Sequence, residues 1–122
     1  MKLHLTRAEG KNLITGYGSG WVQINESRHT ASLILTPTQV LAPWPVESFE
    51  ALAAEHFRAA LDLIPEILLL GVGARLRFPP AACLKLLIEA NIGFEVMDTA
   101  AACRTYNILM AEGRNVTAAL II

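Results

Sequence analysis

Glycines and polar residues that could bind an anion follow two apolar segments of the chain. The run at residues 67–70 leads into Gly71-Val72-Gly73 and then Arg75, and a later segment ends at Asp98-Thr99. Arginines near strand ends can hold a carboxylate or phosphate, and ligands of open α/β sheets bind at the carboxyl ends of strands. Solvated loop charges are the alternative interpretation. The pattern predicts a small-molecule or anion site at these residues: Gly71, Gly73, Arg75, Asp98 and Thr99.

The two glycines do not make a dinucleotide-binding loop. Position 76 is a leucine, so the third glycine of that fingerprint is missing. Residues 74–79 also separate the glycines from the next helical pattern, so that helix cannot begin beneath a pyrophosphate. We therefore expect Gly71 and Gly73 to serve a tight strand exit with close backbone packing.

A second group of residues suits contact with a protein. Arg104 and Asn107 are one turn apart on the expected outward side of the last helix, flanked by Ala100 and Ala111. This small, weakly charged face favours binding another protein or a second copy of the chain, although a plain exposed helix has the same pattern. Trp44 lies between two prolines, either as a cover for the core edge or as a binding anchor.

Motifs for hydrolysis, phosphate transfer and metal binding are absent from the sequence. Ser19 lies between two glycines in an expected hairpin, not in the strand–turn–helix of a nucleophile elbow, and there is no P-loop. His4, His29 and His56 are far apart in the sequence, which argues against a metal site. We therefore assign no catalytic residue, no metal and no cofactor, and we favour a non-enzymatic protein.

The only two cysteines, Cys83 and Cys103, fall on the expected inward sides of two helices. A free cysteine in such a place behaves as a small buried hydrophobe. Their spacing matches no zinc or redox motif. We expect two unpaired and poorly reactive thiols.

The elements that must position these residues alternate along the second half of the chain. Apolar runs at 67–70, 94–97 and 116–122 predict strands, and the stretches 80–90 and 99–112 between them predict helices. Each helix carries the chain back across a sheet face, so these strands pair in a parallel or mixed sheet. The sequence thus predicts a C-terminal βαβαβ unit.

The first half of the chain predicts different structure. Segments at 12–17, 20–25 and 29–35 are rich in β-branched and aromatic residues and are separated by turns, as in an antiparallel β-meander. Apolar residues at helical spacing predict one helix over 47–62. Together the two halves predict a single three-layer α/β domain over residues 1–122, with a mixed central sheet.

Composition limits the partners and the compartment. The 122 residues carry a net charge of −1 and no basic stripe, which disfavours nucleic acid as a partner. The longest apolar region, 61–70, is interrupted by Asp62, Pro65 and Glu66, and it is shorter than the roughly 20 residues that span a bilayer. Residues 1–7 lack the apolar stretch of a signal peptide. We therefore expect a cytoplasmic protein without membrane insertion.

Several stretches together resemble one protein family. They are residues 65–73, 76–80, 93–109 and 112–114, with the Gly-Tyr-Gly hairpin at 16–18 and the loop around Trp44. The family is a small bacterial domain-of-unknown-function family that also has archaeal members and two human ones. The human members are a mitochondrial complex I assembly factor and an adipogenesis-associated protein. The resemblance covers nearly the whole chain.

The resemblance implies a mixed central sheet with helices on one face and further β structure on the other. It implies no catalytic residues, because none are established for the family, and it suggests an assembly or binding role. Our first hypothesis is an interaction domain that assembles a respiratory or membrane-associated complex. The second is a small-molecule or anion-binding domain, with or without enzymatic activity.

Overall fold

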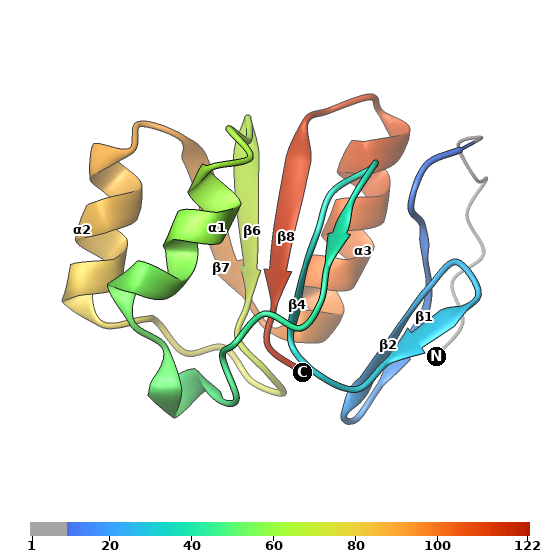
Figure 1. Cartoon of the computed structure of the whole chain (residues 1–122), viewed down its shortest axis with the longest axis horizontal. Coiled ribbons are helices and arrows are strands. Elements are labelled where there is room, and N and C mark those ends of the chain that lie inside the picture. The colour runs from blue at the N-terminus through green and yellow to red at the C-terminus, as the bar shows by residue number, and fades with distance from the viewer. Residues whose placement is uncertain (1–9) are drawn as a thin grey trace.

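Five strands form a mixed central sheet (Figure 1). The structure is a computed structural model that describes residues 10–122, and the strand order in this sheet is β5-β4-β8-β6-β7. The last three strands of that order run parallel, whereas β4 pairs antiparallel with both β8 and β5. The strands are β4 (Leu33–Leu35), β5 (Val40–Leu41), β6 (Ile67–Gly71), β7 (Gly93–Met97) and β8 (Val116–Leu120).

Strand β6 lies inside the sheet, between β8 and β7. Leu68, Leu69 and Leu70 are fully buried, and Ile67 is partly buried. An unbroken apolar run suits a strand whose two faces are both covered, because neither set of alternating side chains meets water. The burial expected for residues 67–70 is thereby confirmed for the three leucines.

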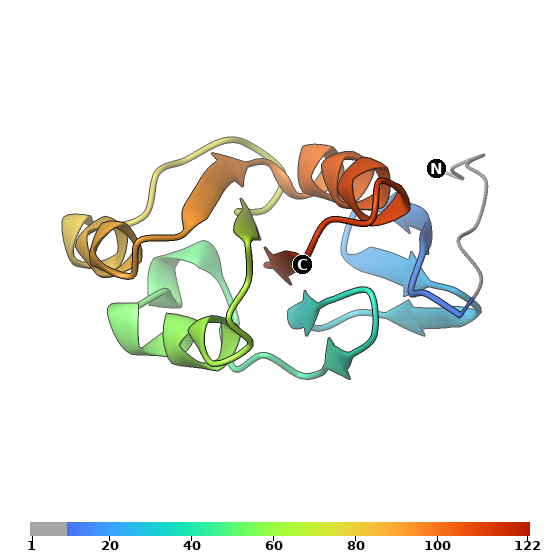
Figure 2. The same cartoon turned by 90° about the horizontal axis from the view of Figure 1, so that it is seen from above.

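Two helices connect the parallel strands and cover opposite faces of the sheet. Helix α2 (Ala81–Glu89) joins β6 to β7, and helix α3 (Thr99–Ala111) joins β7 to β8. These connections run in opposite directions along the sheet, because β8 and β7 lie on opposite sides of β6. Right-handed crossovers then require that the two helices lie on opposite faces. Figure 2 shows α3 on one face and α1 (Arg58–Leu61) on the other, and α2 packs in the same apolar core as α1. The predicted βαβαβ unit is confirmed.

A second, three-stranded antiparallel sheet packs beside α3. It consists of β1 (Ile14–Gly18), β2 (Trp21–Ile24) and β3 (Ser27–His29) and confirms the N-terminal meander. The segment expected at 29–35 is divided, because the chain leaves this sheet after β3 and enters the central sheet at β4. The family resemblance implied helices on one face and β structure on the other. Instead, α3 shares its face with the second sheet.

A buried amide on α3 joins that helix to the second sheet. Asn107 is fully buried; its Oδ1 accepts from the Ile14 backbone N–H at 2.9 Å, and its Nδ2 donates to the Ile14 carbonyl at 2.8 Å. The preceding residue, Tyr106, donates a hydrogen bond from its hydroxyl to the Asn12 backbone carbonyl at 2.8 Å. The prediction of an outward Asn107 is wrong. The polar side chain faces a strand backbone that needs hydrogen bonds, not water.

The prediction of a single helix over 47–62 is also wrong. The stretch forms two 3-10 turns, η1 (Phe49–Ala51) and η2 (Ala54–Phe57), before α1. Leu52, which is buried, has an extended backbone with ψ 128°. The next N–H, of Ala53, is satisfied by His56 Nδ1 at 2.9 Å, so the break leaves that donor paired. The apolar spacing matches the burial of Leu52, Phe57 and Ala60, but Ile64, at the same spacing, is 79% exposed, and the spacing did not reveal that the helix is interrupted.

Trp44 covers the core beneath this interrupted stretch. Its side chain is 3% exposed, it packs edge-on against Phe57 with ring centroids 6.0 Å apart, and its indole N–H donates to the His56 carbonyl at 2.9 Å. The interpretation of Trp44 as a core cover is correct. Trp44 as an exposed binding anchor is wrong, because the ring is already inside the protein.

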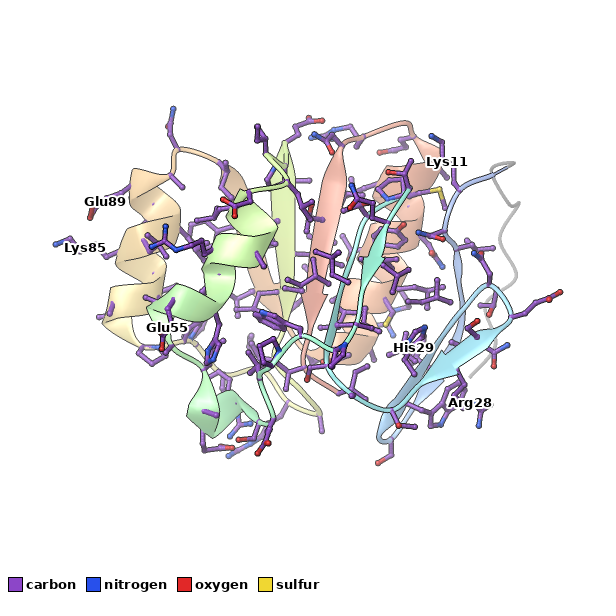
Figure 3. The ribbon with its side chains drawn as sticks, viewed as in Figure 1. Lys11, Arg28, His29, Glu55, Lys85 and Glu89 are labelled. Carbon is purple, nitrogen blue, oxygen red and sulfur yellow. The ribbon has the colours of Figure 1, made fainter. Side chains whose placement is uncertain are left out.

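The outer side of α2 and the two borders of the central sheet face solvent. Lys85 and Glu89 project from α2 as an exposed pair, 3.8 Å apart (Figure 3). Strand β7 forms one border of the sheet, with exposed Glu95 at its centre, and the two-residue β5 forms the other.

None of the helices in residues 10–122 is long and apolar enough to cross a bilayer. The expectations for residues 1–7 and for His4 lie outside the described residues.

The two cysteines lie in separate cores, one on each face of the central sheet. Cys83 packs with the α1 and α2 side, Cys103 packs with the α3 side, and both are free and buried. Burial raises the pKa of the Cys83 thiol and raises that of Cys103 to about 12. The thiols are therefore unpaired, as predicted from the sequence, and protonated at neutral pH.

We expect neither thiol to react with Ellman's reagent in the native protein at about pH 8. The thiolate is the reactive form, and both thiols are protonated and buried. Both should react at once in denaturant. Rapid labelling of one thiol in the folded protein would show that its core opens to solvent, which contradicts the buried positions described above.

Stability should fall at alkaline pH. The pKa of Cys103 is about 12 in the folded protein and 9.0 without burial, so the unfolded chain loses this proton first as the pH rises. The free energy of unfolding should therefore decrease between these two values by up to about 1.4 kcal/mol per pH unit for this group. Urea unfolding of wild type and Cys103→Ala should show a shallower decline in the variant. Equal slopes would contradict a buried Cys103.

Replacing Asn107 by leucine should destabilise the protein by about 2–4 kcal/mol, because the Ile14 N–H and carbonyl lose their partners while they remain buried. Urea unfolding measures the loss, and amide exchange at Ile14 should accelerate. Thr105→Val, a similar-sized change at a half-buried position of the same helix, is the matched control and should cost less than about 1 kcal/mol. An equal loss in both variants would mean that the amide bridge contributes nothing specific.

Candidate functional site

A cavity of about 640 Å³ lies at the carboxyl ends of the parallel strands. Its volume falls within the range of small-ligand sites, roughly 300–1,000 Å³. Two parts of its wall come from the β1–β2 hairpin and from the stretch that contains η1, and three parts follow β6, β7 and β8. The lining consists of residues 17–22, 47–50, 72–74, 98–100 and 121–122, with Arg77.

The cavity lies where the topology of the sheet opens a crevice. Neighbouring strands β6 and β7 send their chains to helices on opposite faces, so the two exits diverge above the strand ends. Ligands of open α/β sheets bind at such points. Gly73, Asp98 and Thr99, three of the residues predicted from the sequence, come together here.

Thr99 ties the three strand ends together. Its hydroxyl accepts from the Gly73 backbone N–H at 2.9 Å and donates to the Ile121 carbonyl at 2.7 Å, while its own backbone N–H donates to the Gly73 carbonyl at 2.9 Å. The hydroxyl thus has a donor and an acceptor inside the protein. Thr99 therefore stabilises the cavity wall whether or not a ligand is bound.

Gly71 and Gly73 are required by this junction rather than by a phosphate. A Cβ added at Gly71 would lie 3.1 Å from the Thr99 Cα and 3.0 Å from a Leu120 methyl carbon. Gly73 has φ 101°, a conformation that side chains rarely adopt. Both observations agree with the tight strand exit expected from the sequence. Gly71 lies next to the cavity wall but does not line it.

Asp98 caps helix α3 at the edge of the cavity. Its Oδ1 accepts from the Ala101 backbone N–H at 2.8 Å, which satisfies one of the free donors of the first helical turn. A carboxylate at this end also interacts favourably with the helix dipole. The position where an anion would meet the helix N-terminus is therefore already taken by a negative side chain.

Arg77, not Arg75, reaches the cavity. Arg75 is exposed and is not part of the lining. Arg77 places Nη1 2.6 Å from Glu50 Oε2, and its guanidinium lies over the Phe49 ring, 4.2 Å from the centroid. A backbone hydrogen bond at Glu50, together with Arg77, holds the pKa of that carboxyl below its usual value. Among residues 10–122, Arg77 is the one arginine in the lining; its Nη1 is ion-paired, whereas its buried Nε has no hydrogen-bond partner in the described structure.

The β1–β2 hairpin contributes an aromatic wall that the sequence interpretation missed. Trp21 lies against Gly18, where an added Cβ would be only 2.4 Å from the indole Nε1. The Arg28 guanidinium covers the indole ring at 3.9 Å. Tyr17, buried beside them, accepts a hydrogen bond from Arg104 Nη1 at 2.7 Å. The glycine-rich hairpin was recognisable from the sequence, but nothing in it indicated which strand ends it faces.

The residues predicted to bind a protein partner do not form one surface. Arg104 is exposed on α3, one turn from Ile108, and its hydrogen bond to Tyr17 raises its pKa. Asn107 and Trp44 are buried, in the clusters on opposite faces of the central sheet. Within residues 10–122, no group of three or more His, Cys, Asp or Glu side chains is placed to hold a metal ion.

Known proteins resemble this chain over most of its length. A human protein named NADH dehydrogenase (ubiquinone) 1 alpha subcomplex assembly factor 3 is 34% identical over 110 residues, which are 88% of this chain and 59% of that protein. The 13 kDa major membrane protein of Francisella tularensis is 31% identical over 106 residues, 86% of each chain. A crystal structure of a Bordetella parapertussis protein is 39% identical, with a TM-score of 0.86, and covers 94% of this chain and 98% of its own.

The human assembly factor is much longer than the region that it shares with this chain, whereas the bacterial relatives match over most of their length. The family described as proteins of unknown function (DUF498/DUF598) matches residues 14–121. That match and these relatives confirm the resemblance seen in the sequence: the chain belongs to the DUF498/DUF598 family, whose members include proteins named as assembly factor 3 of the NADH dehydrogenase 1 alpha subcomplex.

Proposed function

We propose that the protein is a non-enzymatic interaction domain that helps to assemble a respiratory or membrane-associated complex. The names of two relatives support this proposal, one an assembly factor of NADH dehydrogenase and one a membrane protein. The structural observation that carries it is a pair of exposed apolar side chains in the loop between β6 and α2. Leu76 is 53% exposed and Phe78 is 67% exposed.

The two side chains point outward together because Arg77, between them, points inward. Alternate residues of an extended segment face opposite sides. Arg77 is held on the protein side by Glu50 and by the Phe49 ring. Leu76 and Phe78 therefore share the solvent side, and Arg75 lies exposed next to them.

The loop holds this apolar pair in a fixed conformation. Pro79 and Pro80 follow directly, and a residue before proline is restricted to the extended region, which limits Phe78. The ion pair and ring contact of Arg77 anchor the other end. A partner therefore binds an ordered surface, which lowers the entropic cost of association. With Arg75 alongside, the surface fits an apolar groove bordered by carboxylates.

The exposed face of α3 is the less suitable interface. It offers one large apolar side chain, Ile108, which is 53% exposed, and the Arg104 guanidinium is already bonded to Tyr17. Exposed aromatic anchors contribute most strongly to protein interfaces, and α3 presents none beside Ile108. We therefore move the proposed interface from the α3 face to the loop.

The test uses a photo-crosslinking residue at position 78 in the native host, followed by binding measurements with the purified partner. Phe78→Ser should weaken binding at least about tenfold, since buried aromatic anchors contribute more than about 1.4 kcal/mol. Ile88→Ser is the matched control, because Ile88 is 66% exposed, and should change affinity less than twofold (about 0.4 kcal/mol). Both variants should keep the wild-type melting temperature.

Two outcomes would contradict this proposal. Wild-type affinity of Phe78→Ser, combined with loss of binding in Ile108→Ser, would return the interface to the α3 face. A partner that crosslinks specifically but belongs to no respiratory or membrane-associated complex would keep the interaction domain and refute the assembly role.

A second candidate function is supported by a different observation. The cavity at the strand ends has the volume, the aromatic wall and the topological position of a small-ligand site. We propose small-molecule binding there as the alternative to the interaction role.

A further inference from the structure

Within residues 10–122, the wall of the cavity carries charged side chains of both signs in equal number. Arg28 projects from β3 (Figure 3), and its guanidinium is 3.9 Å from the centre of the Trp21 ring. Arg104 Nη1 donates to the Tyr17 hydroxyl at 2.7 Å. The other charged groups belong to lining residues: Glu47, Glu50, Asp98 and Arg77. Three carboxylates thus meet three guanidiniums, and neither sign dominates the wall.

Most of these charges are already engaged inside the protein. Arg77 Nη1 is 2.6 Å from Glu50 Oε2, and Asp98 Oδ1 accepts from the Ala101 backbone N–H at 2.8 Å. Glu47 is exposed, so water solvates it. The Nε of Arg77 has no partner, but it is buried and a ligand cannot reach it. A charged ligand of either sign would therefore lose water at this wall for little compensating attraction.

This arrangement disfavours the anion that the sequence pattern suggested. Arg75, the arginine expected to hold it, is exposed outside the lining. Of the groups that lower the pKa of Glu50, Arg75 contributes least. The Asp98 carboxylate occupies the N-terminus of α3, where an anion would otherwise meet free N–H groups.

Apolar side chains fill the wall between the charges. Trp21 from the β1–β2 hairpin and Phe49 from η1 are half-buried, and Val72 and Ile121 lie at the strand ends. An arginine already lies over each ring, so the rings contribute apolar contact area rather than attraction for a further cation. Covering such half-buried apolar surface is favourable roughly in proportion to its area.

We infer that the cavity binds an uncharged, largely apolar organic molecule. The inference rests on the second proposed function, small-molecule binding at the strand ends. The apolar body packs between the hairpin and η1, against Trp21 and Phe49, and the charged side chains of the wall keep their present partners.

Three probes share one ring system and differ in charge: 2-naphthalenemethanol, 2-naphthoate and 2-naphthylmethylamine. Each is titrated into the full chain and followed by two-dimensional amide NMR. The alcohol should shift the resonances of residues 18–22 and 72–74 and the indole N–H of Trp21. It should bind at least about tenfold more tightly than either ion, because neither ion recovers the hydration that it loses. The indole N–H of Trp44, which is buried and bonded to His56, is an internal control that should not move.

Two variants test the balance of charge. Arg28→Gln removes one guanidinium and Glu47→Gln removes one carboxylate, and both side chains are exposed, so folding should persist. Arg28→Gln should strengthen binding of the amine, and Glu47→Gln that of the naphthoate, each about twofold to fivefold, as expected for one partly screened charge. Alcohol binding should stay the same in both. Glu55→Gln, at an exposed residue of η2 outside the lining, is the matched control and should change none of the three affinities (Figure 3).

Tighter binding of either ion than of the alcohol to the wild-type protein would refute the uncharged ligand and leave small-molecule binding standing. Ion affinities that do not respond to Arg28→Gln or to Glu47→Gln would contradict the balanced wall on which the inference depends. Absence of shifts with all three probes, or shifts away from the cavity, would refute small-molecule binding itself.

Discussion

The hydrogen bonds between the Asn107 amide and the Ile14 backbone determine where the second sheet lies. Strand β1 has one free edge after pairing with β2, and α3 meets that edge with side chains instead of another strand. Tyr106 adds a third bond, to the Asn12 carbonyl. The same face of one helix thus covers the central sheet and holds the β1–β2 hairpin. Together with the Arg104–Tyr17 hydrogen bond and the apolar core that the hairpin shares with α3, this attachment fixes the aromatic wall of the cavity relative to the strand ends.

Polar groups at the strand ends are engaged within the protein itself. The Thr99 hydroxyl joins Gly73 to Ile121, Asp98 caps α3, and Arg77 is bound to Glu50. A catalytic acid, base or nucleophile must exchange protons or electrons with a substrate, which requires that its polar atoms be available. Here the same residue types fix the backbone. These strand-end polar residues therefore stabilise the fold whether or not a ligand binds in the cavity.

The C-terminal half could be predicted from the sequence because local signals specify each of its elements. The apolar run before Gly71 encodes a doubly covered strand, Asp98 caps a helix, and Gly113 ends that helix with φ 81°. Asn107 was misplaced because a helical pattern does not distinguish solvent from a strand edge that needs hydrogen bonds. The break at Leu52 and the hairpin wall of the cavity were also missed. The break is accompanied by a local bond from the Ala53 N–H to His56, which apolar spacing does not encode, and the hairpin wall depends on contacts between residues that are remote in the sequence.

The border strand β7 carries Glu95 at its midpoint, and this position has a consequence for association between copies. Two copies of β7 paired antiparallel over Gly93–Met97 would set one Glu95 against the other, and like charges directly opposite destabilise such a pair. The opposite border, β5, is only two residues long and offers little backbone for a new strand. A single carboxylate therefore protects the longer free edge of the sheet from growing into an extended aggregate of the protein's own chains.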